Sequence, residues 1–181
     1  MGGKFCFSGS LRTRAVALML VAVFPCAAHA ATETDHSGDF RDWSTFIDRN
    51  DDGSKICYMT SLPKASRESK SDVKRDESFI MIARWPIDGD RVDQVRLTGG
   101  YPYATSSQVD AVVDDRKFEL FTDGETAWAY DGDDPKIIAA MKKGIKLTVR
   151  GVSARGTTTW DEYSLRGFTA AYNRIVGNCS S

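Results

Sequence analysis

Short apolar segments alternate with polar turn residues along most of the chain, and this spacing is typical of an antiparallel β protein. We expect strands at residues 43–47, 56–61, 79–83, 94–97, 109–113, 118–121, 127–130 and 145–150, with a return strand near 158–165. Residues 79–83 form an unbroken apolar run, which predicts a strand covered on both faces and ended by Trp85 and Pro86. The pattern therefore predicts a mainly β fold, either an antiparallel β-sandwich or a partly open barrel.

Two short helices complete the pattern, at about residues 134–143 and 167–176. Asp134 is a good N-cap, Pro135 takes the favoured first helical position, and Gly144 follows as a stop. In the second helix, apolar side chains recur on one side, and Gly177 marks its expected end.

The strand at 145–150 and its return strand indicate a hairpin, because the apolar side chains occupy one parity on each strand. A three-residue loop at 155–157 would set Leu147 opposite Leu165 and Arg150 opposite Glu162. We expect that register, or one shifted from it by a bulge. A two-residue loop would bring apolar residues opposite polar ones.

Two stretches lack the alternating pattern. Residues 31–40 are polar and expected to be frayed. Residues 64–76 consist of Lys, Arg, Ser, Glu and Asp with almost no apolar side chain, which predicts a mobile surface loop. The core pattern resumes directly after this run, so it does not indicate a linker between domains.

The first thirty residues have the organisation of a secretory signal peptide. Lys4, Arg12 and Arg14 precede an apolar run at 15–28, and Ala28 and Ala30 place small residues where a signal peptidase cleaves. The run is shorter than the roughly 20 residues that span a bilayer. A lipid anchor on Cys26 is disfavoured because Pro25 precedes it. We expect cleavage of residues 1–30 and a single mainly β domain at 31–181, located in the periplasm, associated with the outer envelope, or secreted.

The charge of the chain argues against some classes of partner, and its cysteine content agrees with export. Three of the 24 basic and none of the 25 acidic residues precede residue 31, so the remainder carries a formal charge of −4. This balance argues against nucleic-acid binding, and we also expect no membrane span. Cys57 and Cys179 would remain, and an even pair in an oxidising compartment most often forms a disulfide. Two buried thiols or an intermolecular bridge are the alternatives.

The chain offers little for catalysis. His36 is the only histidine after residue 30, so neither a Ser-His-Asp triad nor a histidine-rich zinc site can be assembled. No phosphate loop or dinucleotide motif is present. We therefore expect no catalytic residues, no cofactor and no metal. The half-match to a calcium loop at 48–53 indicates a turn, because Met59 stands where a glutamate is needed. Two Ser-x-x-Lys matches, at 61–64 and 71–74, are interpreted as chance.

Paired carboxylates support an alternative function. The pairs are Asp114 with Asp115, Asp133 with Asp134, and Asp161 with Glu162. Two carboxylates across a groove could act as acid and base on a glycan, which would make the protein a small periplasmic hydrolase of cell-wall or other glycans. Each pair also fits a local role as a turn, a helix cap or a solvated strand face.

A candidate interaction surface is formed by Arg155, Trp160 and Glu162. In the expected hairpin, Trp160 shares the polar face with Glu162 and lies close to Arg155, and an exposed Trp beside an Arg suits a protein contact. Packing of Trp160 against the long polar segment is the alternative. The other tryptophans, Trp43, Trp85 and Trp128, lie on separate expected strands and are interpreted as core.

Several segments together resemble the invasion-associated locus B family of exported bacterial proteins. They are residues 153–171, 118–121 with 127–129, 140–144, and Asp42 with Trp43. The resemblance implies a small, mainly β protein of the periplasm or outer envelope without an attached catalytic activity. The expected function is then a non-catalytic envelope protein that acts through its surface, linked to host-cell invasion or envelope integrity. Its expected partner is an envelope or host-surface protein, and direct binding to host cells is a further alternative.

Overall fold

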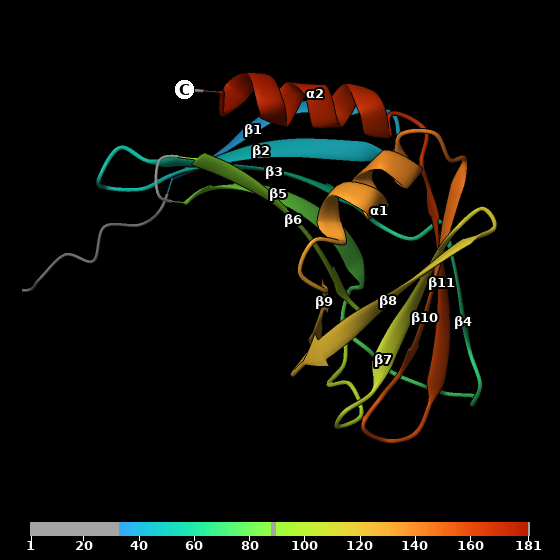
Figure 1. Cartoon of the computed structure of the whole chain (residues 1–181). Helices are drawn as coiled ribbons and strands as arrows, with labels where there is room; N and C mark the ends of the chain where they lie inside the picture. Colours follow the sequence, from blue (N-terminus) through green and yellow to red (C-terminus); the bar gives the residue numbers. More distant parts are fainter. Residues whose placement is uncertain (1–32, 88–89, 181) are drawn as a thin grey trace, which may run out of the picture. The chain divides into compact units, whose positions relative to one another are not determined.

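The computed structural model describes residues 33–87 and 90–180, so the expected signal peptide at 1–30 lies outside the described residues. The strands are β1 (Glu33–Phe40), β2 (Trp43–Arg49), β3 (Lys55–Ser61), β4 (Ala65–Glu68), β5 (Phe79–Ile87), β6 (Asp90–Thr98), β7 (Gln108–Val113), β8 (Arg116–Asp123), β9 (Thr126–Ala129), β10 (Lys146–Val152) and β11 (Thr158–Ser164), and the helices are α1 (Asp134–Met141) and α2 (Phe168–Asn178). Figure 1 shows their arrangement.

The eleven described strands form one antiparallel sheet in the order β1-β2-β3-β5-β6-β9-β8-β7-β10-β11-β4, and this sheet does not close into a barrel. The sheet bends after β6, so that β1, β2, β3, β5 and β6 form one part and the remaining strands another (Figure 1). The mainly β class with two short helices is therefore confirmed, and the open, bent sheet stands closer to a partly open barrel than to two separate layers.

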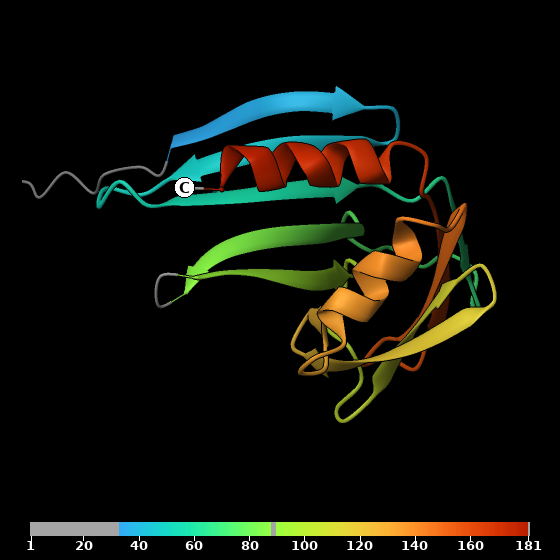
Figure 2. The same ribbon diagram turned by 45° about the horizontal axis from the view of Figure 1, so that its top comes forward.

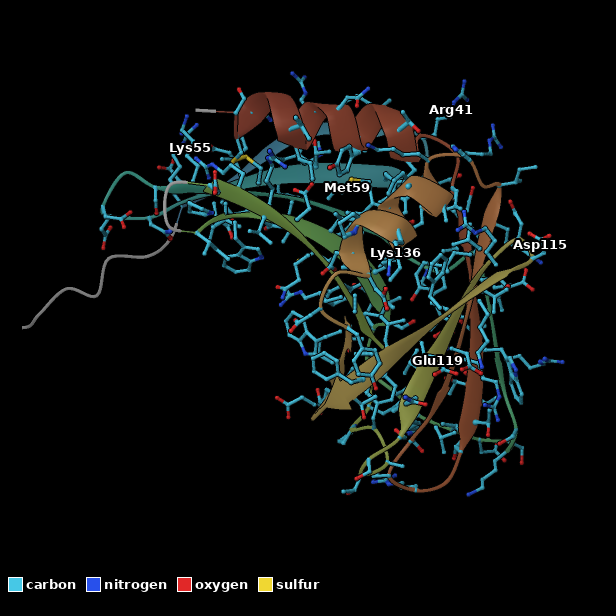
Figure 3. The ribbon with its side chains drawn as sticks, in the orientation of Figure 1. Arg41, Lys55, Met59, Asp115, Glu119 and Lys136 are labelled. Atoms are coloured by element: carbon cyan, nitrogen blue, oxygen red, sulfur yellow. A yellow bond between two sulfur atoms is a disulfide. The ribbon has the colours of Figure 1, made fainter. Side chains whose placement is uncertain are left out.

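Both helices pack on one face of the sheet and enclose the core with it. Helix α2 contacts β1, β2 and β3, whereas α1 contacts β6, as the turned view in Figure 2 shows. Ile80 and Ile82 of β5 point into this core, and Met59 of β3 is fully buried in it (Figure 3). The alternate residues Phe79 and Met81 are only half-buried. The apolar run therefore has one fully covered face rather than two.

A disulfide joins Cys57 of β3 to Cys179, directly after α2, with 122 residues of separation along the chain. The pairing expected from the two cysteines is thus confirmed. Trp43 adds a second connection to this helix, because its ring packs edge-on against Phe168 at 4.9 Å. The C-terminal helix is therefore fixed to an early part of the sheet by a covalent bond and an aromatic contact.

The helix boundaries differ from the expectation in ways that have local causes. Asp133, not Asp134, is the N-cap of α1, and the carboxylate of Asp134 instead accepts a hydrogen bond from the backbone N–H of Val95 at 2.7 Å. Helix α2 continues through Gly177 to Asn178. Its last turn is held by the N–H of Cys179, which donates to the carbonyl of Ile175.

The predicted hairpin register is wrong by two residues. Leu147 lies opposite Tyr163 and Arg150 opposite Trp160, so Glu162 faces Thr148 rather than Arg150. The loop has three residues as expected, but they are 154–156: Ser153 donates its backbone N–H to Thr157, and Gly156 has φ +71°. In a three-residue hairpin loop, a type I turn is followed by a residue with left-handed backbone geometry, which glycine adopts most easily. Gly156 must therefore be the last residue of the loop, whereas the expected loop at 155–157 placed it in the middle.

Three further expectations about strands are wrong. The polar residues 33–40 form β1, which pairs with β2 along its length. Residues 65–68 form β4 at the opposite edge of the sheet, paired with β11. Strand β5 also continues through Pro86 to Ile87. Pro86 lies opposite Arg91, at a position of the antiparallel ladder where no N–H is needed toward β6.

Candidate interaction surface

The structure separates the three residues of the expected interaction surface. Trp160 and Glu162 point outward from β11, on the face of the sheet away from the core. Glu162 lies 3.5 Å from the ammonium of Lys146. Arg155 lies in the β10–β11 turn instead. There it lines a cavity of about 440 Å³ on the other face, with Thr157 and Thr159 among the lining residues.

Trp160 is partly covered by the polar segment that sequence analysis assigned to a loop. The guanidinium of Arg67, its cross-strand neighbour on β4, lies 4.4 Å from the centre of the indole ring. Such a stack contributes about 0.5–1 kcal/mol at exposed sites. Trp160 remains partly exposed beside it. The outer face of β11 therefore presents an Arg–Trp pair rather than an isolated ring.

A buried ion pair fixes the polar segment to β11. Arg75 donates from both terminal nitrogens to Asp161, at 2.8 and 2.5 Å, and its Nε lies 3.2 Å from Glu68. Ser66 donates to the same Asp161 carboxylate. Segment 64–76 is therefore attached at several points and is not a detached surface loop. Sequence reasoning missed Arg75 because nothing in a run of charged residues marks one of them as buried.

Two of the carboxylates weighed for glycan hydrolysis, Asp161 and Asp114, are occupied by structural contacts. Asp161 is 2% exposed and saturated by Arg75 and Ser66. Asp114 accepts hydrogen bonds from the backbone N–H groups of Ile145 and Lys146. Asp115, its neighbour, lies exposed in the β7–β8 turn (Figure 3). Nothing in these contacts favours the hydrolase alternative.

Asp134 is a carboxylate whose pKa is shifted by its surroundings. Burial raises its pKa, the hydrogen bond from Val95 opposes that change, and the nearby negative charges of Asp93, Asp131 and Asp133 raise it further.

The partial motifs also form ordinary local structure. Asp52 accepts the backbone N–H of Ser54 in the β2–β3 turn. Ser61 donates to the carbonyl of Asp42, whose carboxylate lies 2.8 Å from Lys64. Within residues 33–87 and 90–180, no group of three or more His, Cys, Asp or Glu side chains is arranged to hold a metal ion.

A second aromatic surface lies on the outer face of the sheet, where sequence analysis expected core residues. Trp43 is buried as expected, but Trp85 and Trp128 are only half-buried and line a shallow hollow of about 380 Å³. Four large apolar side chains are exposed on the strands and loops around them: Ile87 (48%), Val92 (43%), Phe121 (39%) and Tyr130 (39%). Little in the sequence indicates this surface, because β5 carries apolar residues both at the positions that face the core and at the alternate positions that face outward.

Polar neighbours hold this surface in place. Arg96 lies over the Trp128 ring at 5.8 Å. Tyr130 contacts the Phe121 ring at 5.4 Å and accepts a hydrogen bond from the side chain of Gln108. Contiguous exposed apolar side chains of this kind often mark binding sites. We refer to Trp85, Pro86, Ile87, Val92, Gln94 and Trp128 as the apolar hollow.

Neither helix in the described part of the chain is long and apolar enough to cross a membrane. Searches of curated proteins and of solved structures each give no match. Comparison with protein families gives a match to "Invasion associated locus B (IalB) protein" over residues 43–176, which is well over half of the chain and runs from Trp43 in β2 into α2. The chain therefore belongs to the invasion-associated locus B family.

Proposed function

We propose that this protein is exported, resides in the periplasm or at the outer envelope, and acts without catalysis by binding another protein through the outer face of its sheet. The binding would serve host-cell invasion or the integrity of the envelope. The partner is then an envelope protein or a protein of the host surface.

The observation that carries this proposal is the composition of the uncovered face. The helices cover only one face of the sheet, while the other presents the Arg67–Trp160 pair and the apolar hollow. Trp and Arg are the residues most enriched at the energetic centres of protein interfaces. An exposed face with two such aromatic surfaces suits a binding protein.

Two further features support export and an absence of catalysis. The first thirty residues carry the features of a signal peptide, and the Cys57–Cys179 disulfide suits an oxidising compartment. Two of the carboxylates considered from sequence are engaged in holding the fold: Asp161 by Arg75, and Asp114 by backbone N–H groups. These roles leave them poorly placed to act on a substrate.

Affinity capture from an envelope extract tests the proposal. The wild-type chain is compared with Arg155→Ala and Trp160→Ala, and Asp51→Ala serves as a control because Asp51 is exposed in the turn between β2 and β3, which lie near the opposite end of the sheet from β11. We expect Trp160→Ala to lose a partner that the wild type and the control both retain. Retention of every partner by both Arg155→Ala and Trp160→Ala would contradict the proposed surface.

Fractionation of the natural host tests the location. We expect the protein in the envelope fraction, beginning at Ala31. Recovery from the cytosol with Met1 still present would contradict export and remove the reason to seek partners in the envelope.

A further inference from the structure

The ends of several elements meet at one corner of the molecule. The β1–β2 turn donates the N–H of Asp42 to the carbonyl of Arg166, which lies just before α2. The hydroxyl of Thr169, in the first turn of α2, donates to the carbonyl of Lys142, the C-cap of α1. Figures 1 and 2 both show the end of α1 beside the start of α2. Segments that are far apart in the sequence therefore form one continuous surface here.

Basic side chains predominate on this surface. Arg41, Lys142, Lys143 and Arg166 are all exposed. The ammonium of Lys142 lies over the Tyr172 ring at 3.8 Å. Within the described residues, no hydrogen bond or ion pair engages the side chains of Arg41 and Lys143. These two cations are therefore available to a ligand outside the chain.

The acidic side chains at this corner are fewer, and three of them are already engaged. Asp42 lies 2.8 Å from the ammonium of Lys64. Asp114 accepts two backbone N–H groups, and Glu162 lies 3.5 Å from the ammonium of Lys146. With the exposed β7–β8 turn included, seven basic and four acidic side chains give the corner a formal charge of +3, from Arg41, Lys64, Arg116, Lys142, Lys143, Lys146 and Arg166 against Asp42, Asp114, Asp115 and Glu162. The corner is thus positive in a domain whose total charge is negative.

Two large apolar side chains project from the same corner. Ile145, between Lys143 and Lys146, is 77% exposed. Leu62 is 48% exposed and directly follows Ser61, whose hydroxyl donates to the carbonyl of Asp42. Neither side chain lines the cavity beside Arg155 or the apolar hollow. Both side chains are therefore free to insert into a partner rather than to form the wall of a pocket.

The backbone of Arg41 is held in an unfavourable conformation. Its φ is +59°, in the left-handed region that glycine and asparagine adopt most easily. Arginine is costly at such a position, and strained residues that are not glycine cluster at functional sites. The strain at Arg41 therefore supports a role for its exposed, unpaired guanidinium.

We refer to Arg41, Lys64, Lys142, Lys143, Lys146 and Arg166, together with Leu62 and Ile145, as the basic corner. We propose that the basic corner docks on the surface of an anionic membrane, with its Lys and Arg side chains at the lipid phosphates and Ile145 and Leu62 inserted at the headgroup boundary. Lys and Arg near an anionic surface each strengthen attachment, and apolar side chains add to it by burial. A bilayer surface is deformable, so the projecting side chains need no shaped pocket to receive them.

A protein partner fits the basic corner less well. Lysine is depleted at protein interfaces, whereas four of the six basic residues of the corner are lysines. The attachment is peripheral and goes beyond the proposed function. It would hold the protein at a membrane while the Arg67–Trp160 pair and the apolar hollow, which share no residue with the basic corner, bind a partner.

Co-sedimentation of the purified protein with lipid vesicles tests the proposal. One set of vesicles is phosphatidylcholine alone, and the other contains about 30% phosphatidylglycerol, which is anionic. The basic variant combines Arg41→Gly, which suits the positive φ, with Lys143→Ala. Its charge-matched control combines Lys136→Ala with Arg150→Ala, since these exposed side chains pair with Asp133 and Asp110 away from the basic corner.

A second pair of variants tests insertion. Ile145→Ser removes the most exposed apolar side chain of the corner, and Ile87→Ser is its control because Ile87 is 48% exposed in the apolar hollow. Thermal unfolding of all four variants confirms that they are folded.

We expect wild type to bind the anionic vesicles and not those of phosphatidylcholine alone. The basic variant should bind about tenfold or more weakly, since each basic side chain near the surface contributes about fivefold. Ile145→Ser should weaken binding by about threefold or more, and both controls should stay within about twofold of wild type. Raising the salt from about 50 mM to about 500 mM should release the protein.

Failure of wild type to bind the anionic vesicles would overturn the proposal, as would unchanged binding by the basic variant or by Ile145→Ser. An equal loss with the charge-matched control would show that attraction is spread over the whole surface, which also contradicts a docking site. A labelled poly-glutamate peptide is the last arm: if it binds wild type and loses affinity with Ile145→Ser, the corner binds an acidic protein segment and the proposal is wrong. The assay contains no protein partner, so its failure leaves the proposed function standing.

Discussion

Arg75 and Asp161 form a two-point ion pair in the interior of the protein, although they come from a charged segment and from the middle of β11. Their side chains are 10% and 3% exposed, and Glu68, Ser66 and the carbonyl of Gly99 complete the hydrogen bonding. This network attaches the segment that includes β4 to the sheet. The edge of the sheet therefore depends on one buried arginine.

Asp161→Asn should lower the free energy of unfolding by about 3–5 kcal/mol, because it leaves the Arg75 charge buried without its partner. Urea denaturation followed by circular dichroism measures this change. Arg150→Ala is the control: Arg150 pairs with Asp110 at 3.8 Å on the surface, and its loss should change stability by less than about 1 kcal/mol. Equal effects of the two substitutions would show that Arg75 and Asp161 are not the anchor of this edge.

Replacing each of two glycines near the ends of α2 with alanine should change the free energy of unfolding in opposite directions. Gly167 has φ +92°, and an added Cβ would lie 1.9 Å from the carbonyl oxygen of Phe40. Gly167→Ala should therefore lower the free energy of unfolding by at least about 2 kcal/mol. Gly177 lies inside the helix with nothing within 4 Å of an added Cβ, so Gly177→Ala should raise stability by about 0.5–1 kcal/mol. Thermal unfolding of both variants tests the pair, and a shared sign would contradict the described helix boundaries.

Reduction of the Cys57–Cys179 disulfide should lower the free energy of unfolding by about 2–5 kcal/mol, because the bridge closes a long loop in the unfolded chain. Urea denaturation with and without dithiothreitol measures the difference. The variant Cys57→Ala with Cys179→Ala should lose a comparable amount and should not respond to the reductant. Coincident unfolding curves for oxidised and reduced wild type would contradict this role.

Sequence patterns predicted the parts of this fold whose signal is local. Alternation located the hairpin strands, Pro135 and Gly144 bracketed α1, and an isolated pair of cysteines indicated the disulfide. Strand β4 was not predicted, because its stability comes from pairing with β11 and from Arg75, not from apolar side chains of its own. Its sequence therefore resembles that of a solvated loop.

The interaction surfaces were harder to predict, because outward and inward side chains differ only by position along a strand. In β5, Ile82 points into the core and Trp85 into the apolar hollow, yet both are apolar. The hairpin register failed for a related reason. The required position of Gly156 shifts the pairing of the two strands by two residues. A shift of two leaves apolar residues opposite apolar residues, so the pattern of apolar positions is equally compatible with both registers.

Asp134 predicts a specific dependence of stability on pH. Burial raises the pKa of its carboxyl in the folded protein above the unfolded value, so the folded state holds this proton more tightly. The contribution of Asp134 to stability is therefore greatest in acid and falls as pH rises through the titration. Asp134→Asn removes the ionisation but keeps an oxygen that can accept the N–H of Val95. Measured by urea denaturation from about pH 3 to pH 6, the variant should gain stability relative to wild type as pH rises.

Asp52→Asn provides a control of opposite sign. Hydrogen bonds from the Ser54 side chain and backbone hold the pKa of Asp52 below its usual value. Its contribution to stability is thus present above the ordinary carboxyl pKa and lost in acid, so this variant should lose stability relative to wild type as pH rises. If both variants shift in the same direction, burial does not control the ionisation of Asp134.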